Sequence, residues 1–208
     1  MDEREILKKG AERLGVPFAP AHAEAFSLYL SELLKWNAKV NLTAITNPEE
    51  VAVKHFLDSL SLFRLLPEGP FSAADVGAGA GFPGLPLKIV RPDMDLSLVE
   101  PARKKAAFLK NMARTLGLTG VSVVEEKVED AAVELAGRFD VVVSRAFRGP
   151  RLLLPLAAPL LKKGGSVVLS VGPETEPAPP EGWLVAREEE IVLPFSDFRR
   201  TLIKYKVK

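Results

Sequence analysis

The stretch that decides the fold reads Asp75-Val76-Gly77-Ala78-Gly79-Ala80-Gly81-Phe82-Pro83-Gly84. It lies between an apolar run that ends at Val76 and a segment with helical spacing that begins near Gly84, so we interpret it as a strand-to-helix turn. Glycines let the backbone approach a ligand closely and allow φ angles that other residues resist. The following helix N-terminus presents unpaired amide groups that favour polar or anionic ligand atoms. The stretch therefore predicts the floor of a nucleotide-cofactor site.

Downstream of the breaker cluster at residues 67–70, short apolar runs alternate with helical patterns. We expect strands at 73–76, 96–100, 121–125, 139–144 and 166–171, and helices at 84–90, 102–116, 128–136 and 150–161. This alternation is typical of βαβ units with a parallel sheet covered on both faces. Two further strands, 183–193 and 201–207, have no helix between them and should pair antiparallel at the end of the sheet. The sequence thus predicts an α/β, Rossmann-like sheet of seven mostly parallel strands.

Residues 1–66 show helical spacing and no strand alternation, which predicts a helical N-terminal extension before a sheet domain at 67–208. The segment 37–47 should interrupt the helices, because its asparagines and threonines favour turns and caps. A new helix should then begin with Asn47 as its cap and Pro48 in its first position, and continue to Leu66.

The composition excludes several classes of protein. The 208 residues carry a net charge of only +1, so any surface that attracts nucleic acid must be local. The absence of cysteine excludes disulfides, thiolate metal sites and a cysteine nucleophile. The charged N-terminus and the lack of any long apolar run indicate a cytoplasmic protein with no membrane partner.

Two cofactor classes fit the glycine turn. Gly79-x-Gly81-x-x-Gly84 matches the dinucleotide fingerprint of an NAD(P)-dependent oxidoreductase, whereas Asp75-x-Gly77-x-Gly79-x-Gly81 is typical of S-adenosylmethionine enzymes. Glu100, expected at the end of the second strand, serves either class, because a carboxylate can accept hydrogen bonds from two ribose hydroxyls. Three features favour S-adenosylmethionine: the acidic segment 126–130 after the third strand, the terminal strand pair, and the polar Ser144-Arg145 at the end of the fourth strand.

Several segments together resemble one family. They are similar to motifs of the bacterial small-subunit ribosomal RNA guanine-N7 methyltransferases, also called glucose-inhibited division protein B. The segments are the turn with its continuation Phe82-Pro83-Gly84-Leu85-Pro86, Trp36-Asn37, Asn41-Leu42-Thr43, His55-Phe56-Leu57-Asp58-Ser59 and Ser144-Arg145-Ala146. The resemblance implies a class I S-adenosylmethionine-dependent methyltransferase fold and 16S ribosomal RNA, or the small ribosomal subunit, as partner. Arg199-Arg200-Thr201-Leu202 departs from the Arg-His that is usual before the last strand.

The resemblance also implies cofactor contacts, which with Gly79 of the glycine motif are Gly77, Gly79, Phe82, Glu100, Pro101, Ala102, Val128, Glu129 and Arg145. Guanine N7 has an in-plane lone pair and no proton, so attack on a sulfonium methyl group needs no general base. We therefore expect no catalytic base and no metal, and we expect the substrate base to be positioned by Asn41, Ser144 and Arg145. His55 and Asp58 share a helical face and should make structural hydrogen bonds.

RNA recognition must rest on local basic clusters. One group lies in the expected helix after Glu100 (Arg103, Lys104, Lys105, Lys110, Arg114), and the other, which we favour, follows the fourth strand (Arg145, Arg148, Arg151, with Phe147 available for stacking). We expect the protein to act as a monomer. A non-catalytic RNA-binding assembly factor with a vestigial cofactor pocket and a small-molecule methyltransferase are the remaining alternatives.

Overall fold

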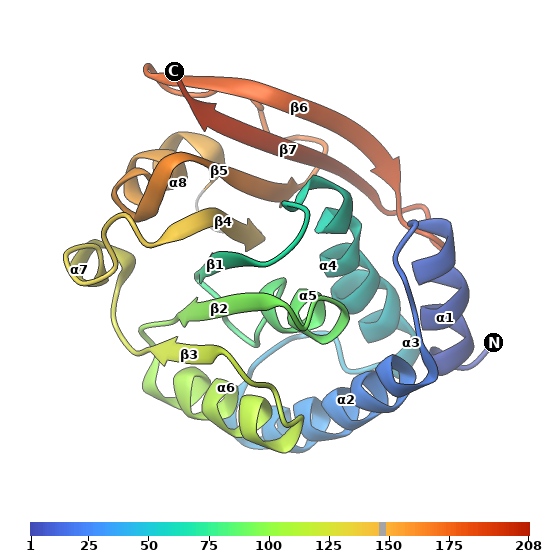
Figure 1. Ribbon diagram of the computed structural model, residues 1–208. Helices are drawn as coiled ribbons and strands as arrows, with labels where there is room; N and C mark the ends of the chain where they lie inside the picture. The colour runs from blue at the N-terminus through green and yellow to red at the C-terminus, as the bar shows by residue number, and fades with distance from the viewer. Residues whose placement is uncertain (146–148) are drawn as a thin grey trace.

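A computed structural model describes residues 1–145 and 149–208 of the chain. Its centre is a seven-stranded sheet with the order β3-β2-β1-β4-β5-β7-β6 (Figure 1). The first five strands are mutually parallel, and β7 runs antiparallel between β5 and β6. The strands are β1 Phe71–Val76, β2 Met94–Val99, β3 Val121–Val124, β4 Phe139–Arg145, β5 Leu161–Val171, β6 Trp183–Val192 and β7 Arg199–Val207. The predicted sheet and its antiparallel pair are confirmed.

Alternate residues of the central strands point to opposite faces of the sheet. On one face, Ala73 belongs to an apolar cluster with the N-terminal helices, α5 and α6. On the other, Ala74 and Val76 belong to a cluster with α7 and α8. These helices are α5 Gly84–Val90, α6 Arg103–Thr115, α7 Val128–Ala131 and α8 Gly149–Ala157, the last followed by the 3₁₀ turn η3 Ala158–Leu160. Ligands of such sheets bind where the parallel strands end, at their carboxyl edge.

The N-terminal helices are α1 Glu3–Arg13 and α2 Pro20–Val40. Phe26, Tyr29 and Leu33 of α2 are fully buried, in the same cluster as Leu96 and Leu98 of β2. The apolar core therefore continues without a break across the boundary that we predicted at residue 66. Within the described residues, no helix combines the length and the apolar character needed to cross a membrane.

The predicted interruption at 37–47 begins too early, because α2 continues to Val40. Asn37 stays inside the helix, and its side chain binds the loop that follows: Nδ2 donates to Thr43 O and Oδ1 accepts from Thr43 N, both at 2.9 Å. The helix ends at Asn41, which adopts a left-handed conformation with φ 53°. The Asn37 amide thus binds the loop that follows the helix and does not cap a helix end, the position that its residue type favours.

The single helix that we predicted up to Leu66 is four consecutive pieces: α3 Pro48–Val51, the π-helical η1 Ala52–Leu57, α4 Asp58–Leu60 and the 3₁₀-helical η2 Ser61–Leu65. Asn47 caps α3 as predicted, accepting a hydrogen bond from Glu50 N at 3.0 Å. In η1 the carbonyls of Lys54 and His55 accept hydrogen bonds from Arg145 Nη1, at 2.8 and 3.3 Å. These bonds come from a distant strand, so local sequence cannot predict the irregular turn.

Candidate active site

The glycine turn is held at both ends by side chains. Asp75, at the end of β1, accepts a hydrogen bond from Gly84 N at 2.7 Å through Oδ2, which closes the loop onto the start of α5. Gly79 has a positive φ of 58°, and a Cβ there would come no nearer than 3.9 Å to the surrounding protein atoms. At Gly81 a Cβ would lie 2.5 Å from Tyr29 Oη. The turn is therefore packed against α2 on one side and open at Gly79.

Glu100 joins the turn to the next strand end. Its carboxylate is only 5% exposed. Oε2 accepts from Gly79 N at 2.8 Å, and Oε1 accepts from Ala102 N at 2.9 Å. Three of the predicted cofactor residues are thus brought together at the carboxyl ends of β1 and β2, and each carboxylate oxygen retains a further lone pair.

An apolar pocket lies beside this arrangement, at the carboxyl ends of β1, β2 and β3. Its lining residues are Val76, Gly77, Val99, Pro101, Lys127, Val128 and Glu129. Four of them were predicted as cofactor residues, and Val128 is the buried apolar side chain among those four. Lys127 is a lining residue that the sequence alone does not single out. The mostly apolar lining of this pocket, which includes Pro101 next to Glu100 in the chain, suits a flat, apolar ligand group.

Asp75 carries an unsatisfied atom. The residue has no exposed surface, and its Oδ1 has no hydrogen-bond partner among the described residues. Burial raises the pKa of the carboxyl group from 3.8 to about 7, although the Gly84 amide and the nearby Arg145 both favour its ionised form. An orphan oxygen of this kind is costly unless a ligand supplies a partner.

Replacing Asp75 by asparagine is expected to remove a loss of stability that the wild-type protein suffers as the pH rises from about 4 to 7. The pKa of Asp75 is higher in the folded state, so this carboxyl group ionises at lower pH in the unfolded chain. Asp75 therefore destabilises the fold progressively as the pH rises from about 4 to 7, by up to roughly 4 kcal/mol. Burial and Arg145 lower the pKa of His55 to about 3, so His55 acts in the opposite sense as the pH falls below 6.5. Urea unfolding measures the free energy of unfolding of the wild-type protein and the variant at pH 4.5 and 7.5. His55 affects both proteins alike, so the contribution of Asp75 is the difference between their changes with pH, and equal changes would contradict the prediction.

Phe82 connects the turn to the N-terminal helices. Its ring stacks on His55 of η1 with 4.6 Å between centroids, and on Tyr29 of α2 at 5.6 Å. Tyr29 Oη donates to Ala80 O at 2.6 Å. The guanidinium of Arg145, at the end of β4, lies 4.9 Å from the centroid of the Phe82 ring. The predicted residues Phe82 and Arg145 are therefore in contact.

Arg145 and Arg200 share one buried carboxylate. Asp58 has no exposed surface; it accepts from Arg145 Nη1 at 3.2 Å and from Arg200 Nε and Nη2 at 3.0 Å. Ser170 Oγ also donates to Asp58 Oδ1, at 2.8 Å. Asp58 and His55 thus have the hydrogen bonds that we predicted, whereas the participation of Arg200 has no signal in the sequence. Among the described residues, no group of His, Asp and Glu side chains is arranged to hold a metal ion.

The remaining predicted residues lie in different surroundings. Ser144 is buried, and its hydroxyl donates to Val76 O at 2.8 Å, so its proton is used between β4 and β1. Asn41 is exposed at the end of α2. Arg151 is exposed and pairs with Glu176 at 3.3 Å. Phe147 and Arg148 lie outside the described residues.

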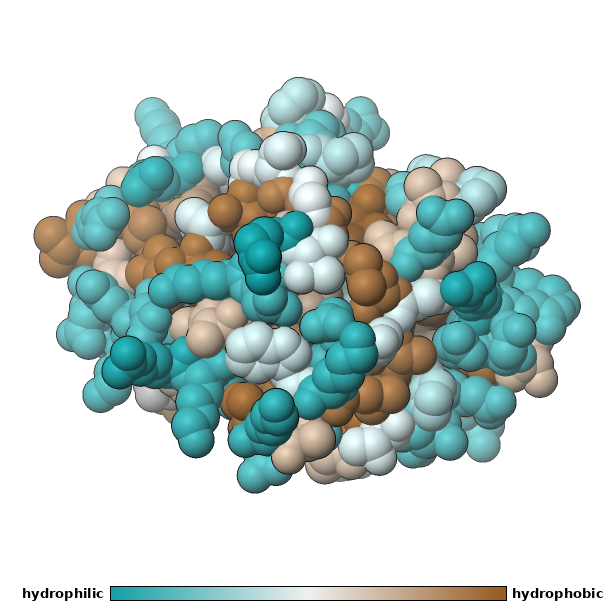
Figure 2. Space-filling model, turned by 90° about the horizontal axis from the view of Figure 1, so that it is seen from below, coloured by the Kyte–Doolittle hydropathy of each residue, from teal (hydrophilic) through white to brown (hydrophobic). Residues whose placement is uncertain are grey.

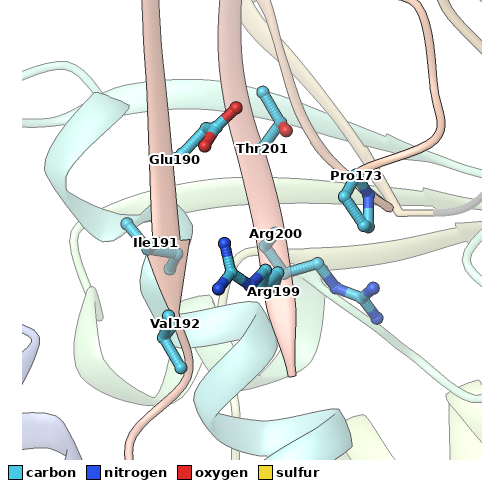
Figure 3. A pocket seen from close by; sticks show the side chains of 7 residues that line it. All are labelled: Pro173, Glu190, Ile191, Val192, Arg199, Arg200 and Thr201. Carbon is cyan, nitrogen blue, oxygen red and sulfur yellow. The ribbon is translucent and has the colours of Figure 1, made fainter. Parts of the chain in front are cut away.

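A second pocket lies between β6, β7 and Pro173 (Figure 3). It is larger, at 670 Å³ against 390 Å³ for the pocket beside Glu100. Its lining includes Arg199 and Arg200 but none of the predicted cofactor residues. We place the cofactor site at the smaller pocket, because only that one adjoins the glycine turn and Glu100.

The fold and the site together define a class of protein. The structure matches a SAM dependent methyltransferase from Aquifex aeolicus with a TM-score of 0.59 and 16% identity, covering 80% of this chain and 97% of the other. It also matches M. jannaschii TYW2 in complex with AdoMet, with a TM-score of 0.54 and 16% identity over 71% of this chain and 74% of the other. The fold is therefore the class I methyltransferase fold, as predicted.

Sequence comparison identifies the family. The family model described as rRNA small subunit methyltransferase G matches residues 22–177. Relatives of that name are 39% identical in Geobacter metallireducens, covering 97% of this chain and 95% of theirs, and 47% identical in Myxococcus xanthus, covering 82% and 79%. The chain belongs to the rRNA small subunit methyltransferase G family and is a methyltransferase. Neither the oxidoreductase nor the non-catalytic alternative is favoured.

Proposed function

We propose that the protein transfers the methyl group of S-adenosylmethionine to N7 of a guanine in 16S ribosomal RNA of the small subunit. The observation that carries the proposal is the hydrogen bond between Glu100 and the Gly79 amide beside an apolar pocket. Family membership supports the choice of RNA. The protein acts as a cytoplasmic monomer in this proposal.

The residues present fit the cofactor. Pro101 and Val128 line the pocket that suits its adenine. Glu100 would hold the ribose hydroxyls of the bound cofactor, since each of its oxygens has a further lone pair. The orphan Oδ1 of Asp75 offers an acceptor for the cationic amino group at the other end. The cofactor supplies a methyl group on a positively charged sulfur, which makes the methyl carbon electrophilic.

The protein's task is to position the two reactants. Guanine N7 is unprotonated, so no residue has to remove a proton. His55 agrees with this, because burial and Arg145 hold its pKa at about 3 and both ring nitrogens are hydrogen-bonded. Alignment of nucleophile and methyl group can contribute about 7–11 kcal/mol to such a step. The rigid contacts around Phe82 and Arg145 support that alignment.

The direct test is transfer of tritiated methyl groups to ribosomal RNA from a strain that lacks the enzyme. We expect incorporation into small-subunit RNA, with 7-methylguanosine recovered after nuclease digestion. Label in another nucleoside would exclude N7 of guanine as the target. Absence of label from both intact subunits and free RNA would exclude the substrate.

Of the basic residues that the structure describes, we favour those of α6 over Arg145 and Arg151 as the RNA contact. Arg145 is committed to Asp58 and to η1, and Arg151 to Glu176. By contrast, the exposed Arg103 and Lys104 of α6 form no ion pair with described residues. Trp36 of α2 packs against the buried Phe108 of α6 with 5.7 Å between centroids, so the two helices are neighbours. Figure 2 shows this side of the molecule, where hydrophilic side chains surround several hydrophobic ones near the middle of the view.

Reversing both charges, Arg103→Glu with Lys104→Glu, is expected to raise the KM for RNA at least about tenfold and to reduce the salt dependence of binding by about 1 to 2 in slope. Affinity for S-adenosylmethionine should stay the same, because neither side chain lines the pocket. Lys8→Glu on the exposed side of α1 is the matched control. An unchanged KM and salt slope in the double variant would remove α6 from the RNA interface.

A further inference from the structure

The hydrogen bonds of His55 fix which of its nitrogens carries the proton. Arg145 Nη2 lies 2.9 Å from His55 Nδ1. A guanidinium can only donate, so Nδ1 accepts this bond and carries no hydrogen. The neutral ring therefore has its single proton on Nε2. This tautomer is imposed by Arg145, whose other contacts hold it in place on Asp58 and on the Lys54 carbonyl.

The proton on His55 Nε2 determines the state of Thr43. Nε2 lies 2.7 Å from Thr43 Oγ1 and donates to it. Ile45 N donates to the same oxygen at 3.1 Å. Both lone pairs of the hydroxyl are thereby occupied, and its own hydrogen remains. Within residues 1–145 and 149–208, the hydroxyl hydrogen of Thr43 has no acceptor within hydrogen-bonding distance, because the nearby His55 Nε2 is itself a donor. Thr43 can act toward a ligand only as a donor.

Thr43 is also rigid and close to the cofactor turn. The Asn37 side chain binds both its backbone N–H and its carbonyl, at 2.9 Å each. His55, its partner, stacks on Phe82 of the turn with an interplanar angle of 19°. Thr43 is half-buried and is followed by the exposed Ala44, so the residue lies at the protein surface. A donor that is fixed in this way can recognise one acceptor atom of a substrate base by a hydrogen bond.

The edge of guanine that contains N7 presents two acceptors, N7 and O6, whereas adenine has an N6 amino donor in place of O6. N7 must stay free to attack the methyl group, so O6 is the atom of this edge available for recognition. We propose, on the basis of the proposed function, that the Thr43 hydroxyl donates a hydrogen bond to O6 of the target guanine and selects guanine over adenine. Adenine would place a donor against a hydroxyl whose lone pairs are already occupied.

The test compares two substrates: small subunits reconstituted with RNA that carries either guanosine or 2-aminopurine riboside at the methylated position. 2-Aminopurine keeps N7 and lacks O6. For the wild-type protein, kcat/KM should fall about tenfold with 2-aminopurine, since the hydroxyl loses its acceptor. For Thr43→Val the two substrates should react with nearly equal kcat/KM, and Thr43→Ser, which keeps the hydroxyl, should retain the preference.

The ratio between substrates is insensitive to a general loss of folded protein, because that loss lowers both values alike. A wild-type preference that persists unchanged in Thr43→Val would overturn the role of Thr43. Equal rates on both substrates for the wild-type protein would overturn it without any variant. Absence of methyl transfer to the guanosine substrate by the wild-type protein would instead overturn the proposed function, and the inference with it.

Discussion

Replacing Asp58 by asparagine is expected to lower the free energy of unfolding by about 3–5 kcal/mol. Its carboxylate has no exposed surface and accepts hydrogen bonds from both Arg145 and Arg200. Asparagine keeps the shape of the side chain, but it removes the charge and turns an amide donor toward a guanidinium. Two buried cations then lose their counter-charge. Urea unfolding followed by circular dichroism measures the loss.

The control for Asp58 is an exposed pair of the same type. Glu5 pairs with Lys9 at 2.7 Å, with side chains 49% and 51% exposed, so Glu5→Gln should cost less than about 1 kcal/mol. Adding Arg200→Gln to Asp58→Asn should recover part of the loss, because one uncompensated cation is removed. A cost for Asp58→Asn no greater than that of Glu5→Gln would show that the cluster contributes little to stability.

Replacing Gly79 by valine is expected to weaken binding of S-adenosylmethionine at least about 100-fold. The new branches would occupy the open side of the turn, where no protein atom comes nearer than 3.9 Å to the Cβ. Valine also resists the φ of 58° and would pull the amide away from Glu100. Isothermal titration calorimetry with S-adenosylmethionine gives the affinity directly.

Gly137 provides a matched control for the strain in the backbone. It has a φ of 64°, a Cβ added there would meet no described atom within 4 Å, and it precedes β4 at the opposite edge of the sheet. Gly137→Val should therefore suffer a similar local strain and keep its affinity for the cofactor. Equal affinities of Gly79→Val and the wild-type protein would show that the cofactor lies elsewhere.

Much of the fold could be predicted because its signals are local. The alternation of apolar runs placed five strands, two strand-like stretches near the C-terminus placed the other two, and the predicted helix 84–90 coincides with α5. The errors occurred where side-chain bonds outside the helical pattern meet the helices. Asn37 stays within α2 and binds Thr43, six residues on, while Arg145, 91 residues away, binds carbonyls in the π-helical η1. The residue types and spacing around Asn37 and Lys54 do not predict that Thr43 and Arg145 are their partners.

The site divides in the same way. By itself, the sequence determined the glycine turn and the place of Glu100 at the end of the next strand, because backbone φ and strand ends depend on a few neighbouring residues. Only the tertiary structure decided that Asp58 binds Arg145 and Arg200, which lie 87 and 142 positions further along the chain. It also decided that Arg145 fixes the position of the proton on His55. These contacts arise because the strand order brings the ends of β4 and β7 beside η1, and hydrogen bonding between distant segments follows from that packing rather than from spacing along the chain.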